Sequence, residues 1–135
     1  MDPSKPKPNF ERINYALRPA KHAERKIFCE TFSRLSLLDN IKNYRYIGMG
    51  SAYFSDFNLF HKTLGITKLL SIEGEDDQEY KDRINFNIPF ACIDVIFGLS
   101  NVVLPKLPWQ SWKKKSIVWL DYVDKLMEYM LGDIE

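Results

Sequence analysis

Two glycines and a glutamate have residue types and a spacing that suit the binding of a nucleoside. Gly48 and Gly50 end the stretch YRYIGMG, and Glu73 lies in TKLLSIEGE, roughly 20 residues further on. Glycines let backbone approach a ligand, and a carboxylate at the end of the next strand accepts hydrogen bonds from both ribose hydroxyls. Taken alone, the glycines equally suit a tight turn and Glu73 a solvated acid. Their combination favours a nucleoside site.

The residues after Gly50 argue against a pyrophosphate ligand. A dinucleotide-binding turn has a third glycine, which lets the helix meet the strand and seats the pyrophosphate. This chain instead continues with Ser51, Ala52 and Tyr53. We therefore expect a nucleoside without a phosphate at this turn.

Polar residues also follow two later apolar stretches. Ser100 and Asn101 follow ACIDVIFGL, and Asp121 ends SIVWLD. Ligands of parallel sheets bind beyond the carboxyl ends of the strands, so these residues are candidates for the same site. Asp121 alone would equally serve as the N-cap of a following helix.

The elements that must position these residues alternate between strands and helices. Apolar stretches predict strands at 44–50, 67–75, 91–100 and 116–122. Amphipathic spacing predicts helices at 19–39, 51–65, 76–87 and 124–135. This alternation predicts the α/β class, with a Rossmann-like, open, mostly parallel sheet of about four strands flanked by helices. The strands at 91–100 and 116–122 are so continuously apolar that we expect both faces of each to be buried.

The first third of the chain precedes the predicted sheet. Residues 1–9 contain three prolines and predict a flexible arm, residues 10–43 an N-terminal helical segment, and residues 44–135 the Rossmann-like cofactor-binding domain. In the helix at 19–39, apolar residues recur every three or four positions, which predicts one buried face. Its members are Ala23, Ile27, Phe28, Phe32, Leu35 and Leu38.

Composition narrows the class of protein. A chain of 135 residues predicts one globular domain. Its formal net charge of +1 gives no overall electrostatic attraction to nucleic acid or to anionic membranes. We expect a cytoplasmic protein whose Cys29 and Cys92 are reduced, and neither has a motif for nucleophilic catalysis. Trp109, Trp112 and the lysines at 113–115 would suit nucleic acid, but a solubilising loop explains them more simply.

The chain resembles class I S-adenosylmethionine-dependent methyltransferases, nearest in pattern to small-molecule O-methyltransferases of the catechol type. The resemblance covers roughly residues 44–125 and lies in YIGMGSAYFSDF, LLSIEGE, IFGLSNVVLPKL and KKKSIVWLDYVDK. LRPAKHAERKIF is also similar to a bacterial group described as putative O-methyltransferases. The resemblance implies S-adenosylmethionine as cofactor, with Gly48, Gly50 and Ser51 in the glycine motif that binds it. It further implies Glu73 on the ribose, Ser100 and Asn101 on the adenine, and Asp121 facing the methyl donor as the catalytic candidate.

The sequence also departs from that pattern. Catechol-type enzymes complete a magnesium site with an Asp-Asn pair on a later strand, which this chain lacks, so we expect no metal at Asp121. The resemblance implies seven strands where four are predicted, as in the cofactor-binding half of such a fold. Either the sequence is a shortened form of such a fold, or a homodimer or a larger partner covers the sheet edge. Whether the chain is an active methyltransferase, or an inactive module for dimerisation or protein assembly, stays open.

Five basic residues begin the helix at 19–39: Arg18, Lys21, His22, Arg25 and Lys26. A solvated helix face explains them most simply. In the family comparison, the same segment would fold over the cofactor and neutralise its carboxylate or an acidic substrate.

Overall fold

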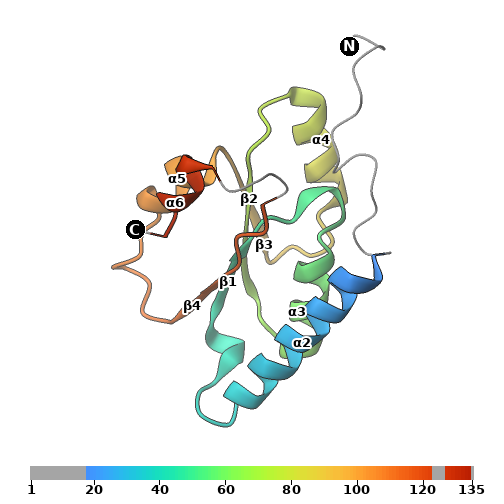
Figure 1. The fold of residues 1–135 in the computed structure, drawn as a ribbon, viewed down its shortest axis with the longest axis vertical. Coiled ribbons are helices and arrows are strands. Elements are labelled where there is room, and N and C mark those ends of the chain that lie inside the picture. The colour runs from blue at the N-terminus through green and yellow to red at the C-terminus, as the bar shows by residue number, and fades with distance from the viewer. Residues whose placement is uncertain (1–17, 123–126, 135) are drawn as a thin grey trace.

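A computed structural model describes residues 18–122 and 127–134 of the chain. Its centre is a parallel sheet of four strands in the order β3-β2-β1-β4 (Figure 1). The strands are β1 (Arg45–Gly48), β2 (Lys68–Glu73), β3 (Ile93–Phe97) and β4 (Ser116–Val118). All three pairings are parallel, so the strands end at one edge of the sheet. The predicted Rossmann-like α/β architecture is confirmed.

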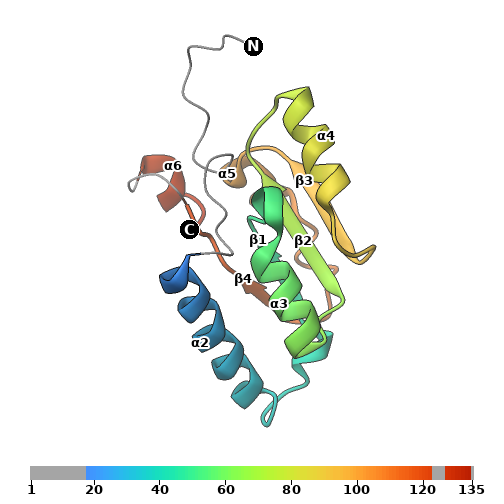
Figure 2. The same ribbon diagram turned by 90° about the vertical axis from the view of Figure 1, so that its right-hand side faces the viewer.

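Helices cover both faces of the sheet. They are α2 (Pro19–Leu35), α3 (Ser55–Leu64), α4 (Gln78–Asn87), α5 (Ser100–Val103) and α6 (Glu128–Leu131). Short 3-10 turns add η2 (Ile41–Asn43), η3 (Ser51–Tyr53) and η4 (Leu104–Lys106). Figure 2 shows α2 and α3 running side by side, and they pack on each other. The α5 and α6 helices lie on the opposite face of the sheet from α3 (Figure 1).

Side chains along β1 and β2 point alternately to the two faces of the sheet, which divides the core into two layers. Tyr46 and Leu69 belong to the layer shared with α2, α3 and α4, whereas Ile47 and Leu70 belong to the layer shared with α5 and η4. Successive side chains of a strand point to opposite faces, so β1 and β2 supply both layers. These two strands are therefore held rigidly in the middle of the molecule, with their carboxyl ends presented at the edge.

Two local signals set the boundaries of α3 and α4. Gly65 adopts a left-handed φ of 69° and its N–H bonds to the carbonyl of His61, which ends α3. Asp77 is the N-cap of α4, and its carboxylate accepts a hydrogen bond from the N–H of Tyr80. The predicted helix ranges, with an end at 65 and a start at 76, lie within two residues of these boundaries.

The buried face of α2 differs from the predicted one. Phe28 and Phe32 pack against the core as expected, but Ala23, Ile27 and Leu35 are exposed. Leu38 lies beyond the end of α2 and is 86% exposed. The contact face instead runs through Arg25, Phe28, Cys29 and Phe32. Aromatic side chains and a buried arginine hold the helix, and the aliphatic residues face outward.

The strands at the two edges are only partly buried. In β3, Asp94 and Ile96 are exposed, and in β4 Val118 is 42% exposed, so the prediction of two buried faces is wrong for both strands. Within the described residues, β3 pairs only with β2, and β4 only with β1. Apolar composition gave no indication of their edge positions. The expectation of a second copy or partner over an edge stays a prediction.

The predicted arm at 1–9 and the start of the segment at 10–43 lie outside the described residues. Cys29 and Cys92 are free thiols. In the part of the chain that the structure describes, no helix combines the length and the hydropathy that a membrane crossing needs.

Candidate functional site

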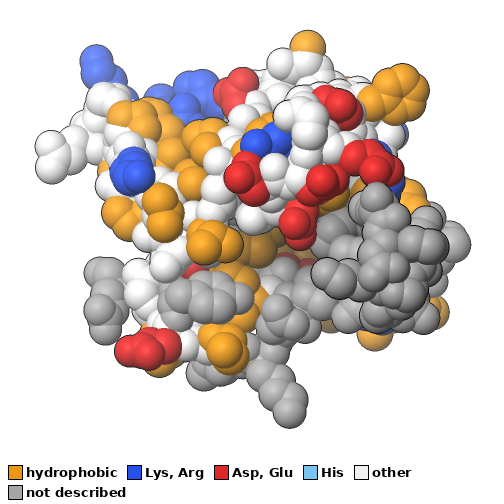
Figure 3. All heavy atoms as spheres, turned by 90° about the horizontal axis from the view of Figure 1, so that it is seen from above, with side chains coloured by type: hydrophobic (Ala, Val, Ile, Leu, Met, Phe, Trp, Pro, Cys, Tyr) orange, Lys and Arg blue, Asp and Glu red, His pale blue; other side chains and the backbone are white. Residues whose placement is uncertain are grey.

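A cavity of about 410 Å³ opens at the carboxyl edge of the sheet. Residues that follow all four strands line it, together with the first turns of α2 and the first residues of α3. Seen from above (Figure 3), acidic side chains gather beside a hollow in this face of the molecule. The exposed acids of the loop after β2 and of the first turn of α4 are Glu75, Asp76, Asp77 and Glu79.

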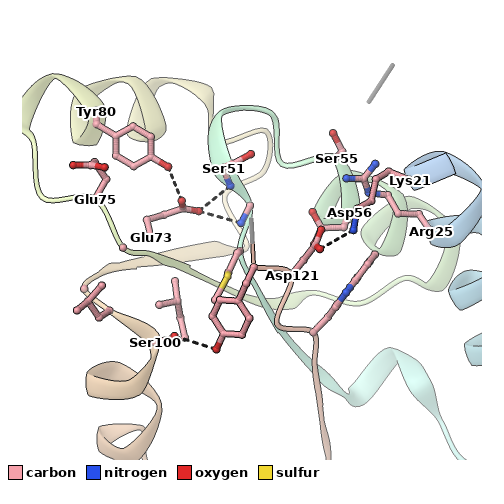
Figure 4. A pocket seen from close by; sticks show the side chains of 18 of the residues that line it. Lys21, Arg25, Ser51, Ser55, Asp56, Glu73, Glu75, Tyr80, Ser100 and Asp121 are labelled. Carbon is pink, nitrogen blue, oxygen red and sulfur yellow. Dashed lines mark hydrogen bonds and ion pairs between the residues drawn. The ribbon is translucent and has the colours of Figure 1, made fainter. Parts of the chain in front are cut away.

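Glu73 is the polar centre of one end of the cavity (Figure 4). Its Oε1 accepts hydrogen bonds from the backbone N–H groups of Gly50 and Ser51, both at 3.1 Å, and from Ser71 Oγ at 2.5 Å. Its Oε2 accepts a hydrogen bond from Tyr80 Oη at 2.8 Å. One carboxylate thus joins the end of β2, the glycine turn and α4.

Burial sets the ionisation of Glu73. The side chain is 4% exposed, and the loss of solvent raises the pKa of its carboxyl above the usual glutamate value, although the four hydrogen bonds partly oppose this shift. Burial and the neighbouring Glu73 carboxylate likewise raise the pKa of the Tyr80 phenol, which stays a hydrogen-bond donor. The site therefore holds a hydrogen-bond acceptor, the Glu73 carboxylate, which backbone N–H and hydroxyl donors stabilise.

The glycine turn is shaped by close packing. A Cβ at Gly50 would lie 2.6 Å from Phe54 Cδ1 and 2.9 Å from Ser71 Oγ, so a side chain does not fit there. Ser51 and Phe54 adopt left-handed φ values of 47° and 48°, which L-residues rarely occupy. Non-glycine residues in this region cost free energy and cluster at functional sites. The turn delivers two adjacent N–H groups to Glu73.

The other end of the cavity holds charged residues of both signs (Figure 4). Asp56, in the first turn of α3, is 7% exposed and accepts a hydrogen bond from the hydroxyl of Tyr46. Burial raises the pKa of its carboxyl, and the charge of Arg25 opposes that shift. Arg25 is 6% exposed. Asp121, which follows β4, accepts a hydrogen bond from Lys21 Nζ at 2.6 Å.

A family model described as "putative O-methyltransferase" matches residues 13–135. The chain belongs to this O-methyltransferase family. The match covers the whole sheet and the helix α2, including every described residue that lines the cavity. No curated protein and no solved structure matches the chain significantly.

The cavity of this O-methyltransferase family member brings together most of the residues that the sequence singled out. Gly50, Ser51, Glu73, Ser100 and Asp121 line it. Gly48 and Asn101 are not among its lining residues. A Cβ at Gly48 would lie 2.5 Å from Tyr46 Oη, so that glycine makes room for the Tyr46 side chain.

Ser100 lies in a small hydrogen-bonded cluster beside the cavity. Its Oγ donates to Asp133 Oδ2 at 2.6 Å, and the Tyr122 hydroxyl donates to the same oxygen. Gly98, which precedes Ser100, has a φ of 153°, and a Cβ there would lie 2.9 Å from Val103 Cγ2. The loop after β3 is thereby fixed against α5, with Leu99 and Ser100 facing the cavity.

Sequence reasoning missed four of the groups that shape the site: Tyr46, Asp56, Tyr80 and the burial of Arg25. Tyr46 and Asp56 lie ten positions apart, in a strand and a helix, so only the fold brings them together. The acid in the first turn of α3 was the available signal. Among the described residues, no group of three His, Cys, Asp or Glu side chains is arranged to hold a metal ion.

Proposed function

We propose that this chain binds S-adenosylmethionine in the cavity and transfers its methyl group to an oxygen of an acceptor. The observation that carries the proposal is Glu73, a buried carboxylate held against the glycine turn at the carboxyl edge of a parallel sheet. Membership of the O-methyltransferase family supports the chemistry. The inactive assembly module has no observation that favours it.

The residues present fit the nucleoside part of the cofactor. Oε2 of Glu73 accepts one hydrogen bond, from Tyr80, whereas Oε1 accepts three. Each carboxylate oxygen has about two acceptor lone pairs, so Oε2, which accepts a single hydrogen bond, retains capacity for one ribose hydroxyl. The loop at Leu99 and Ser100 would hold the adenine beside it.

The other end of the cavity fits the amino-acid part of the cofactor. An α-amino acid carries an ammonium and a carboxylate, and this end offers both carboxylates and cations: Asp56, Asp121, Lys21 and Arg25. Opposite charges at hydrogen-bond distance make strong, oriented contacts. The cofactor would thus extend from Glu73 towards α2, which places Asp121 near the reacting centre.

When bound, S-adenosylmethionine supplies an electrophilic methyl group. The chain's own residues hold the reactants in line, which converts a bimolecular encounter into an oriented reaction. The helix α2 closes one side of the cavity through Lys21 and Arg25, which reduces the access of water to that end. Asp121 is the carboxylate that orients groups around the transferred methyl.

Calorimetric titration with S-adenosylmethionine and S-adenosylhomocysteine tests the proposal. We expect both to bind near one per chain, and Glu73→Gln to weaken them at least tenfold, because the amide offers fewer acceptor positions to the ribose. Glu79→Gln, an exposed charge removed outside the cavity, is the matched control. Circular dichroism checks that each variant is folded. Unchanged affinity in a folded Glu73→Gln protein contradicts the proposal.

Tyr80→Phe provides a second variant if Glu73→Gln fails to fold. It removes only the hydrogen bond to Oε2 and leaves the backbone contacts of Glu73 in place. The freed oxygen keeps its charge, so we expect the cofactor to bind within about tenfold of the native affinity, with an altered enthalpy. The cofactor site is also contradicted if neither the native chain nor a folded Tyr80→Phe protein shows a binding enthalpy for either compound.

A further inference from the structure

The edge strand β4 has one row of backbone groups that no neighbouring strand pairs. Within the described residues, β4 pairs with β1 alone. The carbonyl of Lys115 and the N–H of Trp119 bond to β1, at 3.0 Å and 2.9 Å. Backbone groups of a strand point alternately to its two sides, so the N–H and C=O groups of Ser116 and Val118 point away from β1. An open edge of this kind is a template for a further strand.

The helix α2 lies beside this edge. Figure 2 shows α2 at the margin of the fold, on the β4 side of α3. Phe32 packs on Phe60 of α3, with ring centroids 5.9 Å apart, and Phe28 packs on Trp119, which directly follows β4. One side of α2 thus contacts α3 and the sheet, and the opposite side faces outward beyond β4.

This outward side of α2 is apolar over much of its length. Ile27 is 63% exposed, and Leu35, about two turns further along the helix, is exposed as well. Ala23 and Thr31 are exposed on the same side, because positions four apart are neighbours on a helix. A contiguous exposed apolar patch marks an interaction surface. We call these four residues the outer face of α2.

The charges at the two ends of β4 favour antiparallel pairing with an identical strand. The lysines at 113–115 precede β4, and Asp121 follows it. In a parallel pair of two β4 strands, the lysines of both copies would lie side by side and repel each other. In an antiparallel pair, the lysines of each copy lie opposite Asp121 of the other. The strand is therefore complementary to itself about a two-fold axis.

We propose that two copies of this chain form a symmetric dimer through β4 and the outer face of α2. Val118 lies at the two-fold axis and exchanges both backbone hydrogen bonds with Val118 of the second copy. This register places Ser116 opposite Leu120 of the second copy, so the open backbone groups of both strands are paired. The two sheets join into one continuous sheet.

The register also pairs charges that one chain leaves without a partner. Lys115 pairs with Asp39 and Asp121 with Lys21, and all four side chains are partly exposed. Lys113 is exposed and makes no ion pair within the described residues. In the dimer, Lys115 lies opposite Asp121 of the second copy and Lys113 lies within diagonal reach of it. The second copy thus supplies Lys113 with a carboxylate.

The same axis brings the outer faces of the two α2 helices together. A two-fold axis perpendicular to the sheet keeps both helices on one face of the joined sheet and makes them antiparallel. Because Phe28 packs on Trp119, next to Val118, the middle of α2 lies near the axis. Ile27 of one copy then faces Thr31 of the other, and apolar surface that is exposed in one chain becomes buried in the dimer.

Dimerisation is independent of the proposed function. All residues that line the cavity belong to one chain, so cofactor binding needs one copy only. Antiparallel strands point their carboxyl ends in opposite directions, and the two cavities therefore lie at opposite ends of the joined sheet.

Analytical ultracentrifugation of the full chain measures the oligomeric state. We expect a species of twice the 15.9 kDa chain mass. Ile27→Glu places a charge from each copy in the apolar contact, and should raise the dissociation constant of the dimer at least tenfold. Phe86→Glu changes an exposed apolar residue of α4, outside the interface, and should leave that constant within about threefold of the native value. Circular dichroism checks that both variants are folded.

Cross-linking tests the position of the axis. Oxidation of Val118→Cys should join two chains by a disulfide, because the Cα atoms of a hydrogen-bonded antiparallel pair lie about 5.5 Å apart, within the disulfide range. Phe86→Cys, which lies away from the axis, is the control. A dimer that Ile27→Glu leaves intact, or a Val118→Cys protein that cross-links no more than Phe86→Cys, overturns the proposal. A monomeric chain overturns it as well, and would leave a different protein as the partner of the β4 edge.

Discussion

Glu73 combines two roles in one side chain. It satisfies two backbone N–H groups of the glycine turn, and it offers its second oxygen to the cavity. Burial raises its pKa, so its carboxylate takes up a proton at a higher pH than an exposed glutamate does. A protonated carboxyl accepts fewer hydrogen bonds from a ribose than a carboxylate does.

We therefore predict that S-adenosylhomocysteine affinity falls as the pH is lowered. The loss should begin above the ordinary glutamate range near pH 4.3, because the Glu73 pKa is raised and the ionised form binds the ligand. Calorimetric titrations between pH 5 and 8 measure this dependence, and Glu73→Gln should remove it. Since Asp56 also has a raised pKa, Asp56→Asn serves as the comparison and should retain the Glu73-dependent part. A pH profile that is identical in the native and Glu73→Gln proteins contradicts this assignment.

Two glycines of the cavity offer a matched pair of substitutions. A Cβ at Gly50 would lie 2.6 Å from Phe54, whereas a Cβ at Gly74 would lie 3.6 Å from its nearest neighbour, Leu99 Cδ2. We predict that Gly50→Ala lowers the free energy of unfolding by about 1 to 3 kcal/mol through overpacking. Gly74→Ala should change it by about 0.5 kcal/mol or less. Urea unfolding measures both; equal effects would contradict the close packing at Gly50.

The sequence predicted site residues that lie at the end of a strand. It missed residues that come together only when distant elements pack on each other. Glu73 was predicted because its position depends on spacing along the chain. Arg25 was interpreted as solvated because basic residues on a helix usually are. Its burial depends on where α2 packs, and Asp56 gains its place beside Tyr46 only when α3 lies across β1.

The helix α2 connects the N-terminal segment to the carboxyl edge of the sheet. Lys21 bonds to Asp121 at 2.6 Å, and Phe28 packs on Trp119 with ring centroids 4.8 Å apart. The aromatic contact fixes the helix against the sheet, and the ion pair fixes its first turn over the cavity. The side chains of that pair are 26% and 35% exposed, so solvent screens much of its attraction.

We predict a small but measurable coupling between Lys21 and Asp121. A double-mutant cycle with Lys21→Gln and Asp121→Asn should give about 0.5 kcal/mol in urea unfolding, the range of partly exposed pairs. The same cycle with Lys26 in place of Lys21 should give no coupling, because Lys26 is exposed and makes no ion pair with Asp121. Equal coupling in both cycles would show that the contact does not hold α2.

The sequence predicted the type and order of most elements but not their burial. Apolar stretches placed β1 and β2, and amphipathic spacing placed α3 and α4. The edge positions of β3 and β4 depend on strand order, which local sequence does not encode. The face of α2 was mispredicted in part: Phe28 and Phe32 pack as expected, but Arg25 and Cys29 complete the buried face in place of the aliphatic Ile27.

At the scale of the whole molecule, the cavity is built from residues far apart in the chain. Its lining extends from Arg18 to Tyr122, and the Lys21 to Asp121 contact spans 100 positions. The walls exist only when α2 and all four strands are assembled. The parallel architecture was predictable from the alternation of elements, whereas the packing of α2 over the site was expected only from the family comparison.

We predict that cofactor binding raises the thermal stability of the whole chain. A ligand that binds only the folded state, at a hundred times its Kd, stabilises that state by about 2.7 kcal/mol. For a domain of this size, the expected increase in Tm is on the order of 10 °C. Differential scanning calorimetry with and without S-adenosylhomocysteine measures it. Adenosine alone should give a smaller shift, and an unchanged Tm at saturating S-adenosylhomocysteine contradicts the prediction.

A residue-resolved titration tests the cofactor site at Glu73 most directly. Addition of S-adenosylhomocysteine to the isotope-labelled chain, followed by the amide resonances, reports where the ligand lies. We predict that the amide resonances of Gly50, Ser51 and Ser100 shift, while those of the exposed Leu38 and Phe86, outside the cavity, stay unchanged. Absence of shifts at Gly50 and Ser51, or shifts confined to residues outside the cavity, would contradict a cofactor site at Glu73.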